Sequence, residues 1–272
     1  MKTQVLNVVR KTSSSTSEGS TNNQNSGKAG SGPRFVEVLV PLYSYPSNAY
    51  SNELFNKVIS ICKSYPKVSF NIILNNSNGA GEQKDGNFTA VIKRLKACGN
   101  VRILGYTTTQ YAVAPIEQVK DTVDKWSSWY GVDGIFYDEM AEQPTETFLK
   151  YYKDLRDYAR KKGMYPVVTN PGFPVVEDFF SQEVADIICV FESPVSPDES
   201  SLKGDYQGGF SDYPPQTRGA LLYGQSTLNT GDIDKLLKYA NNVYITDGLL
   251  PNPWINIPSY FEEFVKYIST HY

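Results

Sequence analysis

The chain has 272 residues, 40% of them hydrophobic, a net charge of −3 and a single histidine, His271, beside the C-terminus. Because no basic stripe is present, we expect no nucleic-acid partner, and one terminal histidine argues against histidine metal sites and Ser-His-Asp triads. Cys62, Cys98 and Cys189 are odd in number and widely spaced, which argues against a disulfide framework or a zinc site, and Cys189 lies in an apolar run typical of a buried strand.

Residues 1–33 are rich in Ser, Asn and Gly and form no apolar face, which predicts a disordered tail. The first ten residues lack the apolar stretch of a signal peptide, so the export route of the protein stays open. No run approaches the roughly 18 apolar residues of a membrane helix, and we expect no membrane span. Residues 34–272 are predicted to form one domain.

Eight apolar runs rich in β-branched residues follow the tail. Most begin about 32 residues after the previous one, which is the size of one βα unit. The runs are almost continuously hydrophobic, as expected of parallel strands that are buried on both faces. They begin near Phe35, Val68, Val101, Val132, Tyr165, Ile187, Gly219 and Val243.

Stretches with apolar residues at helical spacing fill the gaps between these runs. The clearest predict helices within 116–130, 148–159 and 258–268. Residues 195–218 are polar and rich in Gly and Pro, so we expect a long loop with little helix in place of the sixth helix.

Eight βα units on one chain favour a single (β/α)8 TIM barrel over a doubly wound sheet. No G-x-G-x-x-G motif follows the first strand, and no G-x-x-x-x-G-K-[ST] motif occurs. Residues 79–81 are a weak phosphate signal and are interpreted as a βα loop. We therefore expect no organic cofactor and no metal.

The active site of such a barrel lies at the carboxyl ends of its strands. The predicted strand ends carry carboxylates, amides, hydroxyls and phenols, but no Lys, Arg, His or Cys. Such a set can bind sugar hydroxyls and supply the two carboxyls of glycoside hydrolysis. The 20 tyrosines of the chain serve either as barrel packing or as platforms that stack on sugars. The strand-end residues are Tyr43, Tyr45, Asn75, Tyr106, Thr108, Asp138, Glu139, Asn170, Glu192, Tyr223, Gln225 and Asp247.

Asp138 and Glu139 end the run GIFYDE, and Glu192 ends the run ICVFES. Apolar walls and a nearby carboxylate would raise the pKa of Glu192 and keep its proton near neutral pH. Adjacent strand residues point to opposite faces, so Asp138 and Glu139 both reach a cleft only if the alternation loosens at the strand end. The acids could instead cap helices or pair with lysines. Asn170 could belong to a simple Asn-Pro-Gly turn, and Asp247 is interpreted as a turn residue.

Several segments of the chain resemble the sequences of the spherulin-4 family, or spherulation-specific family 4. The resemblance covers residues 35–272, and GVDGIFYDE is its most specific part. It implies a (β/α)8 barrel, and fungal members of the family include a glycoside hydrolase of galactosaminogalactan, which contains α-1,4-linked galactose and N-acetylgalactosamine. The chain departs from the family pattern at 75–81 and 112–114, in loops that would touch sugar. The matching segments are VPLYSYP, ILNN, LGYTTTQY, GVDGIFYDE, TNPG and VFES.

By this resemblance Asp138 is the nucleophile or charge stabiliser, Glu192 the general acid/base and Glu139 a supporting acid. The expected enzyme is an endo-acting, retaining hydrolase of polysaccharide that contains galactosamine and N-acetylgalactosamine. The family suggests an extracellular or cell-wall location and a link to encystment, and we expect a monomer. The residues expected to bind substrate are Tyr43, Tyr45, Asn75, Tyr106, Asn170 and Tyr223.

The sequence is compatible with two other functions. A non-catalytic cyst-wall or spore-wall protein would bind polysaccharide on the same barrel face and would not need Asp138 and Glu192 together. A metal-dependent phosphodiesterase or an aldolase-type barrel is disfavoured, because no histidine and no Schiff-base lysine stands at a strand end.

Overall fold

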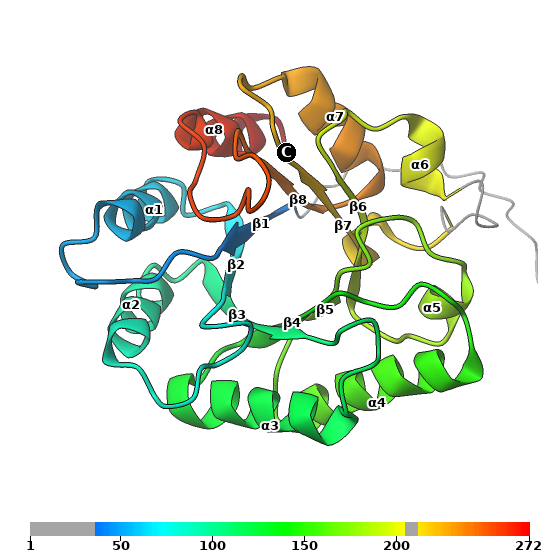
Figure 1. Ribbon diagram of the computed structural model, residues 1–272. Coiled ribbons are helices and arrows are strands. Elements are labelled where there is room, and N and C mark those ends of the chain that lie inside the picture. The colour runs from blue at the N-terminus through cyan, green and yellow to red at the C-terminus, as the bar shows by residue number, and fades with distance from the viewer. Residues whose placement is uncertain (1–35, 205–211) are drawn as a thin grey trace, which may run out of the picture. The chain divides into compact units, whose positions relative to one another are not determined.

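The structure is a computed structural model that describes residues 36–204 and 212–272. Eight parallel strands close into a barrel in chain order, β1 pairs with β8, and helices surround the ring (Figure 1). The predicted (β/α)8 barrel is therefore confirmed. The predicted disordered tail over 1–33, and with it the predicted domain boundary, lies outside the described residues.

All eight strands lie where the apolar runs predict them. Their side chains are nearly all buried, because one face fills the barrel and the other packs against helices. The strands are Glu37–Leu42 (β1), Ser69–Leu74 (β2), Val101–Thr108 (β3), Gly134–Asp138 (β4), Val167–Thr169 (β5), Ile187–Ser193 (β6), Arg218–Leu222 (β7) and Asn242–Ile245 (β8).

The helices alternate with the strands, and five of them begin after an Asn, Asp or Thr whose side chain accepts a backbone N–H of the first turn. The helices are Glu53–Ser64 (α1), Gly86–Lys96 (α2), Ile116–Lys125 (α3), Glu146–Lys161 (α4), Asp178–Ser181 (α5), Glu199–Lys203 (α6), Thr230–Tyr239 (α7) and Phe261–His271 (α8). Short π-helical and 3-10 segments cover Trp126–Tyr130 (η1) and Pro215–Thr217 (η3).

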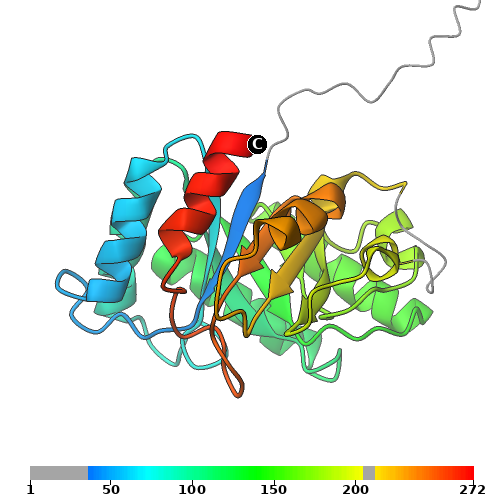
Figure 2. The same ribbon diagram turned by 90° about the horizontal axis from the view of Figure 1, so that it is seen from above.

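One helix boundary differs from the expected one, and the stretch 195–218 holds little helix, as expected. The last helix begins at Phe261 and not at Pro258, because the two residues close a turn in which the Phe261 N–H donates to the Pro258 carbonyl at 3.1 Å. The stretch predicted to be a long loop contains only the five-residue α6 and the short η3, and residues 205–211 within it are not described. The loop between β8 and α8 projects farthest from the carboxyl ends of the strands (Figure 2).

A polar layer occupies the amino end of the barrel. Arg102 on β3 forms an ion pair with Glu37 on β1, and its Nε donates to Asn71 Oδ1 on β2 at 3.0 Å. The Asn71 amide donates in turn to Glu37 Oε2 at 2.6 Å. This arginine is thus neutralised at the end of the barrel opposite to the strand ends that carry the acids. Among the described helices, none has the length and apolar character needed to cross a membrane.

Trp126 lies directly on β3 because residue 105 is a glycine. The indole Nε1 donates to the Tyr106 carbonyl at 2.7 Å, which fixes the ring in place. A Cβ on Gly105 would approach the indole ring to 2.5 Å. The packing of η1 on β3 therefore excludes any larger residue at this position.

Gly105→Ala should accordingly destabilise the barrel by about 1–3 kcal/mol, the usual cost of overpacking a core. Thermal unfolding followed by circular dichroism would show this as a lower Tm. Gly86→Ala is the matched control, because a Cβ at this first residue of α2 meets nothing within 4 Å. An equal Tm for the two variants would contradict the packing argument.

Candidate active site

A pocket of about 360 Å³ opens at the carboxyl ends of β4 to β7. It combines carboxylates, an amide and aromatic rings, and no lysine or arginine of the described ranges 36–204 and 212–272 lines it. Its lining residues are Tyr111, Asp138, Glu139, Asn170, Pro171, Gly172, Phe173, Glu192 and Tyr223.

The side-chain amide of Asn170 holds two carboxylates together in this pocket. Its Nδ2 donates to Asp138 Oδ1 at 2.9 Å and to Glu192 Oε2 at 2.8 Å. The two accepting oxygens cannot be farther apart than the sum of these distances. That limit is shorter than the roughly 6.5–9.5 Å between the carboxyls of inverting glycosidases and agrees with the roughly 5–5.5 Å of retaining ones.

Asp138 faces the barrel because it lies in phase with the inward residues of β4. The intervening Tyr137 faces outward, where its hydroxyl donates to the Leu155 carbonyl on α4 at 3.2 Å. Tyr106 on the neighbouring β3 donates to Asp138 Oδ2 at 2.8 Å. Burial raises the pKa of Asp138, while the hydrogen bonds from Tyr106 and Asn170 favour the ionised form and oppose this rise.

Glu139 reaches the same pocket because its backbone departs from strand geometry. Its φ is 55°, in the left-handed region that a residue with a Cβ enters at a cost of about 1–2 kcal/mol. Thr109 supports this conformation, since its hydroxyl donates to the carbonyls of Asp138 at 2.9 Å and Glu139 at 2.8 Å. The Thr108 hydroxyl donates to the Glu139 carboxylate. The alternation is thus broken at the strand end, and both acids line one pocket.

Glu192 faces the barrel because of an irregularity in β6. The register between β6 and β7 shifts between Cys189 and Phe191, which accommodates one extra residue. Cys189 and Glu192 are three residues apart and would point to opposite faces of a regular strand. The partners of Cys189 and Glu192 on β7 are Gly219 and Leu221, which are two residues apart and share a face, so the extra residue brings Cys189 and Glu192 to one face. Burial raises the pKa of the Cys189 thiol, and the carboxylates of Glu192 and Asp138 raise it further.

The Asn-Pro-Gly turn after β5 also supports Glu192, whose backbone N–H donates to the Gly172 carbonyl at 2.8 Å. The pKa of Glu192 is raised to about 7, and burial is the largest cause. The hydrogen bond from Asn170 lowers this pKa, and the negative charge of Asp138 raises it. Asn170 is itself buried, and its Oδ1 accepts no hydrogen bond from a described residue. The turn therefore positions an amide between two acids rather than only reversing the chain.

The structure brings some of the other predicted residues to this pocket and leaves others outside. Tyr223 lines it. Tyr43 lies near the acids, and its ring stands edge-on to the Tyr106 ring with 5.3 Å between the ring centroids. Burial raises the pKa of Tyr43, and the charge of Asp138 raises it further. Tyr45 is turned away, and its hydroxyl donates to Asp85 Oδ2 at 2.8 Å.

Three further strand-end residues, Asn75, Gln225 and Asp247, are not among those that line the pocket. Asn75 Oδ1 is buried without a hydrogen-bond partner among the described residues. The Gln225 amide donates to the carbonyl of Pro194 at 2.7 Å. Asp247 Oδ2 accepts the Ser259 N–H at 3.3 Å, which links the end of β8 to the loop before α8.

Sequence reasoning missed two aromatic residues of the pocket, Tyr111 and Phe173. Both lie on loops that follow strands, and both are unusually exposed for large apolar rings, at 58% and 39%. The available signal was their position in loops directly after β3 and β5. The sequence does not indicate which way such a loop turns.

The alternative that the acids serve only as ion-pair partners receives no support. Over the ranges 36–204 and 212–272, no lysine or arginine pairs with Asp138, Glu139 or Glu192. Nor does that part of the chain contain a group of three or more His, Cys, Asp or Glu side chains arranged to hold a metal ion.

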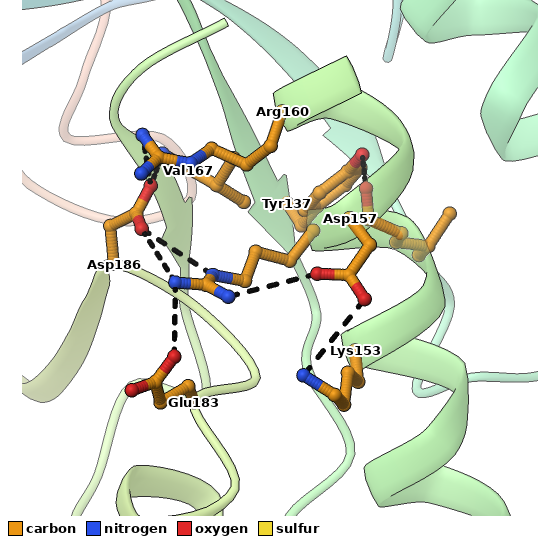
Figure 3. Close-up of polar contacts among 9 residues, drawn as sticks. Tyr137, Lys153, Asp157, Arg160, Val167, Glu183 and Asp186 are labelled. Carbon is orange, nitrogen blue, oxygen red and sulfur yellow. Dashed lines mark hydrogen bonds and ion pairs between the residues drawn. The ribbon is translucent and has the colours of Figure 1, made fainter.

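A larger hollow of about 630 Å³ lies at the other end of the barrel, beside α4 and the amino ends of β5 and β6. Figure 3 shows Arg160, Glu183 and Asp186 gathered there. Arg156 pairs with Asp186 at 3.3 Å and with Glu183 at 3.5 Å, and Arg160 pairs with Asp186 at 3.7 Å. The guanidinium of Arg160 also lies over the Tyr165 ring at 4.7 Å. These charges join α4 to the strands, so we assign this hollow a structural role.

The model of the family described as Spherulation-specific family 4 matches residues 37–268. No curated protein sequence matches the chain. Among solved structures, the chain is similar to Aspergillus clavatus Sph3 in complex with GalNAc, with 26% identity and a TM-score of 0.74. That match covers 86% of this chain and 97% of Sph3.

Two other barrels are similar at lower identity. The apo endo-beta-N-acetylglucosaminidase of Cordyceps militaris is 11% identical with a TM-score of 0.56, covering 89% of this chain and 92% of that one. The GH18 chitinase ChiB of Flavobacterium johnsoniae is 11% identical with a TM-score of 0.54, covering 86% and 93%. At this identity the likeness shows a shared fold alone, the (β/α)8 barrel.

The raised pKa of Glu192 has a consequence for stability. Between its ordinary pKa of 4.5 and its folded value of about 7, the folded protein retains a proton that the unfolded chain has released. Stability therefore falls as the pH rises through this window. Glu192→Gln removes this loss, so its free energy of unfolding relative to wild type should be about 1–3 kcal/mol higher at pH 8 than at pH 4. Urea unfolding at both pH values measures this, and a pH-independent difference would contradict it.

Proposed function

The chain belongs to spherulation-specific family 4, and from this premise we propose that it is a glycoside hydrolase that cuts a hexosamine-containing polysaccharide within the chain. One observation carries the proposal, the bridge of Asn170 between the carboxylates of Asp138 and Glu192. Two carboxyls at such a separation, without a cation beside them, can divide the roles of acid and nucleophile.

The hydrogen bonds of the two acids favour different protonation states. Asp138 accepts from both Tyr106 and Asn170, which favours its ionised form. Among the residues that the structure describes, the Glu192 carboxylate accepts from Asn170 alone, and burial raises its pKa to about 7. At neutral pH the proton of the pair is therefore expected on Glu192.

In the proposed reaction Glu192 donates this proton to the glycosidic oxygen as the bond to the anomeric carbon breaks. Asp138 attacks the anomeric carbon, or stabilises its developing positive charge, from the other side. The Glu192 carboxylate then takes a proton from water, whose oxygen displaces Asp138 from the sugar. Two displacements at one carbon retain the anomeric configuration. Glu139, held by Thr108, supports the substrate as an additional acceptor.

The proposed substrate is a polysaccharide with α-1,4-linked galactosamine and N-acetylgalactosamine units. The GalNAc in the Sph3 complex supports this class, because that structure matches this chain over 86% of its length. The acidic pocket without lysine or arginine is also unsuited to anionic sugars. Tyr223 and Phe173 lie where sugar faces could stack on them.

Asp138→Asn and Glu192→Gln should each lower the release of reducing ends by about 10²–10⁴-fold, the usual contribution of such a group. The assay uses galactosaminogalactan, chitin and their deacetylated forms, with product masses read out. Polymer binding should survive in both variants. The control is Asp247→Asn, which removes a strand-end acid outside the pocket and should retain activity.

If the unmutated protein binds these polymers but releases no reducing ends from any of them, the hydrolase proposal fails and the wall-protein function is favoured. Products confined to single sugars from one chain end would contradict endo-acting cleavage.

The protonation of Glu192 also determines how the rate depends on pH. A general acid works only while it holds its proton, so kcat/KM should fall as the pH rises through about 7. The alkaline limb should be absent with an aryl glycoside whose leaving group needs no proton. A rate that stays constant between pH 6 and pH 9 on the natural linkage would rule out Glu192 as the acid.

A further inference from the structure

A second pocket, of about 310 Å³, lies beside the pocket that holds the acids. The end of β3 and the loops after β2, β3 and β4 form it. Its lining residues are Asn78, Tyr106, Thr108, Gln110, Tyr111 and Glu139. Tyr111 and Glu139 line both pockets, so the two hollows meet at these side chains.

Tyr111 is held at this boundary by its backbone. Its N–H donates to the Glu139 carbonyl at 2.7 Å, which ties the loop after β3 to the end of β4. The residue is 58% exposed, so its ring is open to a ligand although its backbone is fixed. An exposed ring that is fixed in position between two hollows is suited to stack on a ligand that spans both.

The backbone around Tyr111 is strained. Gln110, Tyr111 and Ala112 have φ values of 48°, 56° and 64°, three consecutive residues in the left-handed region with no glycine among them. Such strain persists only where surrounding bonds enforce it, and it concentrates at ligand sites. Here Val113 N–H donates to the Gln110 carbonyl at 3.0 Å, which closes the turn. The strain is an observation independent of the pockets, and it points to the same residue.

We propose that this second pocket, lined by Asn78 and Gln110, binds the sugar unit next to the one at Asp138 and Glu192, with Tyr111 as the platform between the two units. The inference rests on the proposed function and extends it to a site for at least two consecutive hexosamine units. The amides of Asn78 and Gln110 can donate to and accept from ring hydroxyls. The Glu139 carboxylate, at the junction, accepts from a hydroxyl or an amino group of either unit.

Binding in the Glu192→Gln background tests this subsite without turnover. The probes are oligosaccharides of one to six units from partial hydrolysis of galactosaminogalactan, titrated by calorimetry. Affinity should rise with chain length, and Asn78→Gly and Gln110→Gly should each weaken binding of the longer chains about tenfold without affecting the single sugar. Glycine suits the positive φ of both positions, so these variants should keep the Tm of the parent.

Tyr111 has its own pair of variants. Tyr111→Ala should weaken binding of every oligosaccharide, whereas Tyr111→Phe keeps the ring and should bind like the parent. Tyr50→Ala is the matched control, because Tyr50 is also an exposed loop tyrosine but lines neither pocket.

The outcomes separate the two proposals. Binding that does not depend on chain length, or on residues 78 and 110, overturns the second subsite and leaves the hydrolase proposal intact. Binding of no oligosaccharide at all by the folded Glu192→Gln protein overturns both.

Discussion

The amide of Asn170 between two buried carboxylates is the interaction on which the site depends. Two anions at this separation repel strongly where water is scarce. An amide with two N–H groups can serve both oxygens at once, and in the part of the chain that the structure describes no lysine or arginine lines the pocket to neutralise them. The repulsion is relieved instead by protonation, which is why burial and the charge of Asp138 can hold the pKa of Glu192 near 7.

Strands with regular alternation could not bring Asp138, Glu139 and Glu192 into one pocket. Alternation would send Glu139 toward the helices, and the left-handed backbone at that residue returns it to the barrel mouth. Alternation would also separate Cys189 from Glu192, and the extra residue in β6 places them on one face. Each irregularity costs conformational free energy and is held by bonds from a neighbouring loop, such as those of Thr109 to the end of β4.

The distribution of cations complements this arrangement. Arg102 is neutralised by Glu37 at the amino end of the barrel, and Arg156 and Arg160 are neutralised by Glu183 and Asp186 beside α4. These arginines therefore stabilise the barrel away from the site, while the side chains at the carboxyl ends of the strands are acids, amides and phenols. A mouth of this composition favours neutral or amino sugars over anionic ones, in agreement with the proposed substrate class.

The sequence by itself determined the fold class and the strands, because parallel strands buried on both faces leave continuous apolar runs at the spacing of a βα unit. It also identified Asp138, Asn170 and Glu192, since a residue directly after such a run stands at the barrel mouth. It could not show that Tyr45 is turned toward Asp85, or that Tyr111 and Phe173 line the pocket. Those outcomes depend on loop backbone torsions that long-range packing imposes. Only the tertiary structure decided that one amide joins two acids from strands that are not neighbours, because local periodicity carries no record of distances across a barrel.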